Sequence, residues 1–197
     1  MRLPSRPPTA EPWGGGRTST SMSMVDYQEL LKANRKKPLG SAGGFTPLSW
    51  GRPEIKLILP HREPFLLVDR LTGVNFEEES LCGLRFLSPT DPVFAGHFPE
   101  FPVYPGCLEV EMIGQLGLCL SYFLDRRTTA PPQEAVPLQV RATRILGASY
   151  FEPVLPGTEV TLLARKLEHD EYFASVIGQV IVDHKVACVA ICEVCFL

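Results

Sequence analysis

The sequence predicts an α+β fold in which an antiparallel sheet packs against one long helix. The first observation is an apolar run at residues 107–124, which as a helix would be ~27 Å long and would cross a small domain. The second is a series of four extended runs that follow it and are rich in β-branched residues. The third is the shortness of the turns between these runs, which favours antiparallel neighbours. A buried helix and a sheet form a two-layer domain.

The chain has 197 residues, enough for one domain with an appendage, and we expect a leader at residues 1–50 and a folded domain at residues 51–197. The segment 1–24 is rich in Pro, Gly, Ser and Thr, so we expect it to be disordered. Its arginines resemble those of an organelle transit peptide, and a start codon assigned too far upstream explains the segment equally well. We expect a short helix at residues 25–37 and loop structure at residues 38–50.

Charge and cysteine content exclude several classes of function. The net charge is −3 and the basic residues are scattered, which does not favour nucleic acid as a partner. Six cysteines without a secretory signal indicate reduced thiols and a cytoplasmic protein, with organelle import by the leader left open. Cys192 and Cys195 form a C-x-x-C pair, but in a strand they face opposite sides, so we expect no metal site.

The domain is expected to begin with a short helix at residues 54–59, which Pro60 ends. Extended runs at residues 66–74 and 80–88 then predict two strands joined by the acidic turn 75–79. His61 lies between the helix and the first of these strands. We interpret it as a loop histidine without a role in the site.

The central apolar run at residues 107–124 is nearly long enough to span a membrane. Glu109, Glu111 and Gln115 lie in its first half, where charge is costly in a bilayer, so we interpret the run as a core helix and expect no membrane association. Glu109 and Glu111 are two positions apart and point to nearly opposite sides of the helix. Glu111 shares a polar stripe with Gln115.

His97 lies in the proline-rich loop that leads into this helix. An imidazole can accept a proton near neutral pH, and a carboxyl group in an apolar pocket can donate one. The N–H groups at the start of the helix can stabilise a developing oxyanion. The spacing of His97 and Glu111 fits this chemistry and fits equally a core histidine beside an exposed glutamate.

Four extended runs after the helix predict the remaining strands, at residues 136–146, 158–167, 172–182 and 185–196. Turn residues separate them, notably at 154–158 and 182–185. His169 and His184 lie in such turns and are expected to be solvated.

The segment GHFPEFPVYPGCLEVEMIGQ, which begins at Gly96, resembles the active-site segment of the 3-hydroxyacyl-acyl-carrier-protein dehydratases, the FabZ and FabA families. Those families have G-H-F, a short loop, P-V-x-P-G, an acidic residue fourteen positions after the histidine and a glutamine four positions later. The acid is Glu111, as in the FabZ type, whereas Cys107 is more similar to the FabA type. Residues 59–70 and 151–162 also resemble these families. The resemblance implies the hot-dog fold, a sheet wrapped around one central helix.

The resemblance implies an enzyme that removes water from (3R)-3-hydroxyacyl thioesters on acyl carrier protein, giving trans-2-enoyl thioesters for fatty-acid or related acyl-chain biosynthesis. His97 would be the base and Glu111 the acid, in a homodimer or higher oligomer whose sites combine residues of two chains. No metal or organic cofactor is implied. The remaining residues expected to contact substrate are Gly106, Cys107, Phe98, Tyr104 and Gln115.

The sequence departs from this family pattern at the position of a basic pair that helps to receive an acidic carrier protein. Phe151 and Glu152 stand there, although Arg141 and Arg144 lie nearby in the sequence. A coenzyme A thioester therefore stays open as the substrate, as for a hydratase. A hot-dog thioesterase and a non-catalytic acyl-binding subunit stay open as well. The presence of both His97 and Glu111 argues against each of these two.

Overall fold

The computed structural model describes residues 24–40 and 43–197 and confirms the α+β, hot-dog architecture. Its strands form one antiparallel sheet in the order β1-β2-β3-β5-β6-β7-β4. The strands are β1 (Thr46–Trp50), β2 (Arg70–Asn75), β3 (Ser80–Phe86), β4 (Val140–Tyr150), β5 (Glu159–His169), β6 (Phe173–Val182) and β7 (Lys185–Phe196). The helices are α1 (Met24–Ala33), α2 (Arg52–Ile58), α3 (Val93–Gly96) and α4 (Gly106–Arg126).

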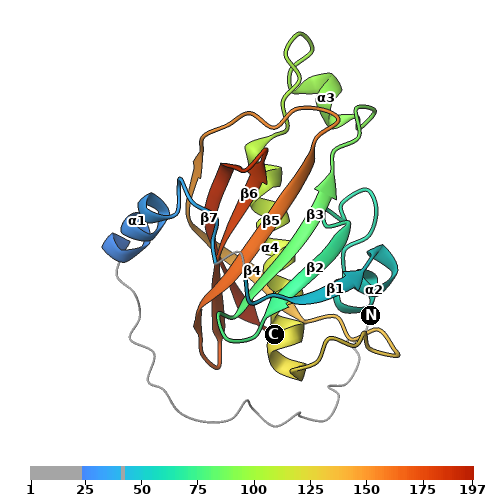
Figure 1. Ribbon diagram of the computed structural model, residues 1–197, viewed down its shortest axis with the longest axis vertical. Coiled ribbons are helices and arrows are strands. Elements are labelled where there is room, and N and C mark those ends of the chain that lie inside the picture. Colours follow the sequence, from blue (N-terminus) through green and yellow to red (C-terminus); the bar gives the residue numbers. More distant parts are fainter. Residues whose placement is uncertain (1–23, 41–42) are drawn as a thin grey trace, which may run out of the picture.

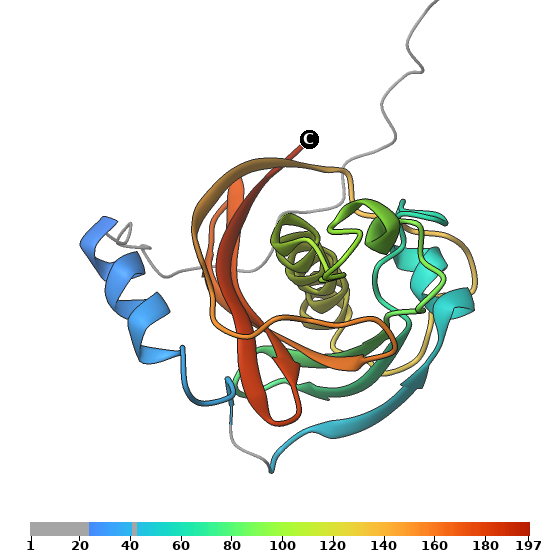
Figure 2. The same ribbon diagram turned by 90° about the horizontal axis from the view of Figure 1, so that it is seen from above.

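The sheet curves around α4, as Figure 2 shows from above, and α4 runs along its inner face (Figure 1). Met112, Ile113 and Leu116 of this helix are fully buried. The helix approaches the sheet closely at Gly117, where an added Cβ would lie 2.8 Å from Cγ2 of Val176 on β6. Helix α4 is long and apolar enough to cross a membrane, but 67% of its apolar 18-residue stretch is buried inside the protein. The expectation of a core helix is therefore confirmed.

Strand β1 lies where loop structure was expected, within the segment assigned to the leader. Its side chains alternate in burial, and Leu48 and Trp50 point into the core. The Trp50 ring lies 4.9 Å from that of Phe123 on α4. The strand was not predicted because it is short and contains Pro47, although proline is acceptable in a strand at the edge of a sheet. Residues 1–23, where disorder was expected, lie outside the described residues.

Two further elements differ from expectation near the site. Strand β4 begins at Val140, not at residue 136, because the N–H of Val136 donates to the carbonyl of Leu57 in α2, at 2.7 Å. Pro137 follows and has no N–H for a sheet ladder. Residues 93–96, for which no helix was predicted, form the short helix α3.

The outer face of the sheet is also apolar, and the segment after α1 is fastened to it by Gln179. This fully buried side chain on β6 accepts a hydrogen bond from the N–H of Leu39 at 2.7 Å and donates to the carbonyls of Asn34 and Lys37 at 2.6 and 2.8 Å. Tyr27 and Leu31 of α1 pack over the same face, in a second cluster of buried side chains. Figure 2 shows α1 outside the curve of the sheet.

The Gln179→Leu variant is expected to lose about 2–3 kcal/mol of unfolding free energy, because the N–H of Leu39 and two carbonyls then lack their buried partner. Urea unfolding followed by circular dichroism measures this. The matched control, Gln133→Leu at an exposed position, should change stability by less than ~0.5 kcal/mol. Equal stabilities of the two variants would show that the outer segment does not depend on Gln179.

Candidate active site

His97 lies directly after α3, at the base of a loop that projects from the end of the sheet (Figure 1). Its backbone is held from both sides. Its N–H donates to the carbonyl of Val93 at 3.2 Å, and its carbonyl accepts from the N–H of Val103 at 2.9 Å. The loop therefore returns to His97 before α4 begins at Gly106.

The imidazole of His97 is oriented by the same loop. Its Nδ1 lies 3.0 Å from the carbonyl oxygen of Val103. A carbonyl can only accept, so Nδ1 carries the proton in this contact, and in the neutral ring the lone pair is then on Nε2. Phe98 stacks on the ring, with centroids 4.2 Å apart. This arrangement suits Nε2 for the role of a base.

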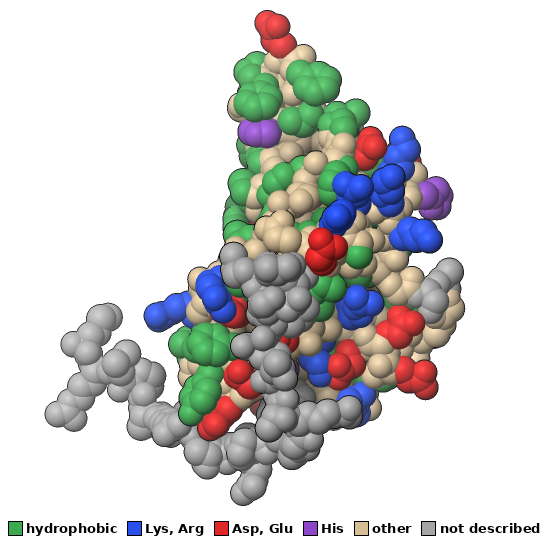
Figure 3. All heavy atoms as spheres, turned by 90° about the vertical axis from the view of Figure 1, so that its left-hand side faces the viewer, with side chains coloured by type: hydrophobic (Ala, Val, Ile, Leu, Met, Phe, Trp, Pro, Cys, Tyr) green, Lys and Arg blue, Asp and Glu red, His purple; other side chains and the backbone are tan. Residues whose placement is uncertain are grey.

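The loop exposes two aromatic side chains on either side of its turn. Phe98 is 54% exposed and Phe101 is 63% exposed. Figure 3 shows hydrophobic side chains gathered at this end of the molecule. Tyr104 is buried against Phe94, and burial raises its pKa to about 12.

Helix α4 begins at Gly106, next to the His97 loop. Tyr150 of β4 packs over this point so closely that a Cβ on Gly106 would lie 2.6 Å from its ring. The first N–H groups of a helix have no acceptor within it and carry partial positive charge. The side chain of Cys107 is exposed beside them. Gly106 and Cys107 thus lie where an anionic oxygen would be stabilised.

Glu111 and Gln115 meet on the side of α4 that faces the loop between α2 and β2. The amide nitrogen of Gln115 donates to Oε1 of Glu111 at 2.8 Å and to the carbonyl of Phe65 at 2.9 Å. Its oxygen accepts from the N–H of Leu67 at 2.8 Å. Gln115 is fully buried, whereas the side chain of Glu111 is 34% exposed. The glutamine therefore fixes both the loop and the carboxylate.

His61, to which no role was assigned, lies in this same loop. Its Nε2 is 3.6 Å from Oε1 of Glu111. The two residues are fifty positions apart in the sequence, and no spacing rule joins them. Only the fold of the loop brings them together.

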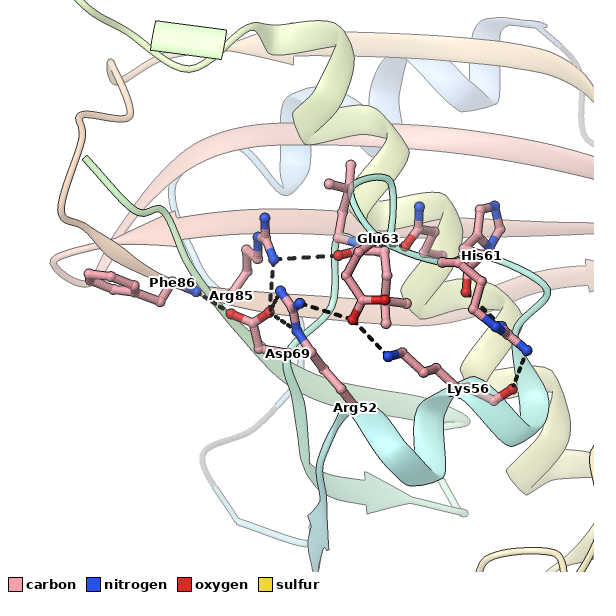
Figure 4. Close-up of polar contacts among 11 residues, drawn as sticks. Arg52, Lys56, His61, Glu63, Asp69, Arg85 and Phe86 are labelled. Atoms are coloured by element: carbon pink, nitrogen blue, oxygen red, sulfur yellow. Dashed lines mark hydrogen bonds and ion pairs between the residues drawn. The ribbon is translucent and has the colours of Figure 1, made fainter. Parts of the chain in front are cut away.

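A network of charges at the far end of this loop ties it to the sheet (Figure 4). Asp69 accepts hydrogen bonds from Arg52 at 2.6 Å, from Arg85 at 2.8 Å and from the N–H of Phe86 at 2.7 Å. Burial opposes ionisation of Asp69, but these donors outweigh it and lower its pKa.

Glu109 differs from Glu111 as the helix geometry predicts. It is only 4% exposed, and its Oε2 has no hydrogen-bond partner among the described residues. Burial raises its pKa to about 8, so the side chain is largely protonated at neutral pH. Of the two carboxyl groups, only that of Glu111 reaches solvent.

His97 and Glu111 share no hydrogen bond or ion pair within the described chain. The structure brings Glu111 together with Gln115, and His97 together with Phe98, at two separate points near the start of α4. No group of three or more His, Cys, Asp or Glu side chains among residues 24–40 and 43–197 could hold a metal ion.

Comparison with known proteins identifies relatives over most of the chain. A family model described as a FabA-like domain matches residues 59–191. The 3-hydroxyacyl-acyl-carrier-protein dehydratase FabZ of Polynucleobacter necessarius subsp. necessarius is 38% identical over 125 residues, 64% of this chain and 77% of that protein. FabZ of Magnetococcus marinus is 37% identical over 141 residues, 70% of this chain and 85% of that protein.

A solved structure is similar in fold. It is the dehydratase heterocomplex ApeI:P of Xenorhabdus doucetiae, one chain of which superposes with a TM-score of 0.50. That match covers 73% of this chain and 90% of the other, at 16% sequence identity.

The raised pKa of Glu109 predicts a specific dependence of stability on pH. Below the ordinary pKa of 4.5, Glu109 is protonated in both the folded and the unfolded chain, and its contribution to the free energy of unfolding is complete. As pH rises above 4.5, only the unfolded chain releases the proton, so this contribution falls. It is lost above pH 8, the approximate pKa of Glu109 in the folded protein. Relative to the wild type, Glu109→Gln should therefore gain on the order of 2–4 kcal/mol of unfolding free energy between about pH 5 and pH 8.

Urea unfolding at several pH values, with the wild type in the same buffers as reference, measures this difference. Stability curves that run parallel with pH would contradict a protonated Glu109 in the folded protein.

Proposed function

Because this chain belongs to the FabA-like family, as a FabZ-type dehydratase, we propose that it removes water from (3R)-3-hydroxyacyl thioesters to give trans-2-enoyl thioesters. The relatives' names give acyl carrier protein as the carrier, and we propose the same carrier for this chain. The observation that carries the proposal is the orientation of His97, whose Nδ1–H is occupied by Val103 and whose Nε2 is left as a base.

In the proposed reaction, Nε2 of His97 takes a proton from C2 of the acyl group. The N–H groups at Gly106 and after it stabilise the negative charge that develops on the thioester oxygen. The C3–O bond then breaks as Glu111 gives its proton to the leaving hydroxyl, which departs as water, and the C2–C3 double bond forms. His97 ends the reaction protonated and Glu111 ends it ionised.

The free oxygen of Glu111 suits the acid role. Oε1 already accepts the hydrogen bond of Gln115. Oε1 directs a lone pair, and not a proton, at the amide N–H of Gln115. We therefore assign the acidic proton to Oε2, which donates it to the hydroxyl. Gln115 contacts substrate only through Glu111 in this proposal, and Phe98 and Cys107 line the approach. Tyr104 is buried against the ring of Phe94, so in this proposal it packs in the core rather than lining the approach.

We propose that two chains complete each site, because His97 and Glu111 share no hydrogen bond or ion pair within the described part of one chain. Strand β4 lies at the end of the sheet and, among the described strands, pairs with β7 alone. An exposed edge of 11 residues is a surface on which another strand pairs readily. Ile145 on this strand is 64% exposed and is apolar. A homodimer paired through β4 would cover it.

Dehydratase activity should depend on both proposed catalytic residues. His97→Ala and Glu111→Gln are each expected to lower kcat/KM by about 100- to 10,000-fold, as loss of a general acid or base does. The assay follows hydration of crotonyl and longer enoyl thioesters on acyl carrier protein and on coenzyme A, with His184→Gln as control. Full activity of Glu111→Gln would contradict the acid role, and preference for coenzyme A would change the proposed carrier.

The proposed dimer has its own test. Ile145→Lys places a charge at the β4 edge and should shift the molar mass measured by light scattering from that of two chains toward that of one. Phe86→Lys, at an exposed apolar position on β3, which is four places from β4 in the sheet order, is the matched control and should stay dimeric. A dimer that persists unchanged in Ile145→Lys would place the interface elsewhere.

A further inference from the structure

His61 occupies a built position beside Glu111. Its backbone carbonyl and that of Leu59 accept hydrogen bonds from the guanidinium of Arg62, at 2.7 and 2.8 Å. Four residues further along the loop, the side chain of Gln115 donates a hydrogen bond to the carbonyl of Phe65, and it accepts another from the N–H of Leu67. The loop is thus fixed on both sides of His61, and Figure 4 shows His61 between α2 and α4.

The imidazole is mostly enclosed and faces the carboxyl group of Glu111. Its side chain is 23% exposed, and its Nε2 is 3.6 Å from Oε1 of Glu111. Its Nδ1 is buried without a hydrogen-bond partner among the described residues. A separation of 3.6 Å is longer than a hydrogen bond, so the two groups are in polar contact without a hydrogen bond between them.

The two neighbours of Glu111 approach the same oxygen. Gln115 donates to Oε1, and His61 faces Oε1. The carboxyl group is therefore held at Oε1, and neither Gln115 nor His61 is paired with Oε2. A carboxyl without such partners rotates freely about its last bond and presents either oxygen.

We propose that His61 is a positioning residue for the dehydration step, which acts through Glu111 by fixing which carboxyl oxygen faces the substrate. The proposal rests on the proposed function, because it needs Glu111 to be the acid. His61 itself exchanges no proton with substrate. Its effect is on the orientation of the donor, so it should change the rate of the chemical step more than the binding of substrate.

Two substitutions separate the polar contact from the volume of the ring. His61→Leu removes the polar group and should lower kcat about five-fold while KM changes by less than about two-fold. His61→Gln keeps a polar N–H at a similar reach and should restore most of the rate. Melting temperatures of both variants check that the fold is kept. His184→Leu, in an exposed turn, is the matched control.

The deciding measurement combines His61→Leu with Glu111→Gln. If His61 acts through Glu111, the double variant should be no slower than Glu111→Gln alone. A further five-fold loss in the double variant, or an unchanged kcat in His61→Leu, would overturn the proposal while leaving the dehydratase intact. A wild-type protein without turnover on any thioester would instead overturn the proposed function, and this inference with it.

Discussion

The burial of α4 is the constraint on which the rest of the structure depends. A helix that is apolar on most faces must be covered on most faces, and the curved sheet covers one side while the loop between α2 and β2 covers another. Polar groups on such a helix need partners. Gln115 meets this need by bonding the loop backbone, and the same amide holds Glu111. The packing of the loop on α4 and the position of Glu111 are thus both determined by the hydrogen bonds of Gln115.

Two glutamates on one helix illustrate how environment decides chemistry. Glu109 and Glu111 have the same side chain and lie within one turn of each other, yet Glu109 faces the sheet and Glu111 faces the loop. The first is neutral and enclosed, and the second is accessible and oriented. A carboxyl group on this helix can serve in acid–base chemistry only where the loop leaves it a path to substrate.

Much of the fold could be predicted from the sequence, because apolar periodicity reports directly on burial. The central helix and the last three strands follow from it, as does the opposite orientation of Glu109 and Glu111. Strand β1 was not predicted, because a five-residue run that contains Pro47 is too short for its alternation to stand out from loop sequence. His61 could not be predicted either. Its place depends on the path of a loop, which is set by Asp69, Arg62 and Gln115 rather than by local spacing.

The segment that covers the outer face of the sheet limits how far the chain can be shortened at its N-terminal side. The family match begins at residue 59, but the apolar side chains of β4, β6 and β7 on that face are shielded by residues that precede it, among them Tyr27, Leu31 and Leu39. A chain trimmed to the matched residues would present this hydrophobic surface to water and lose β1 as well. Such a fragment should be poorly soluble even with every catalytic group in place.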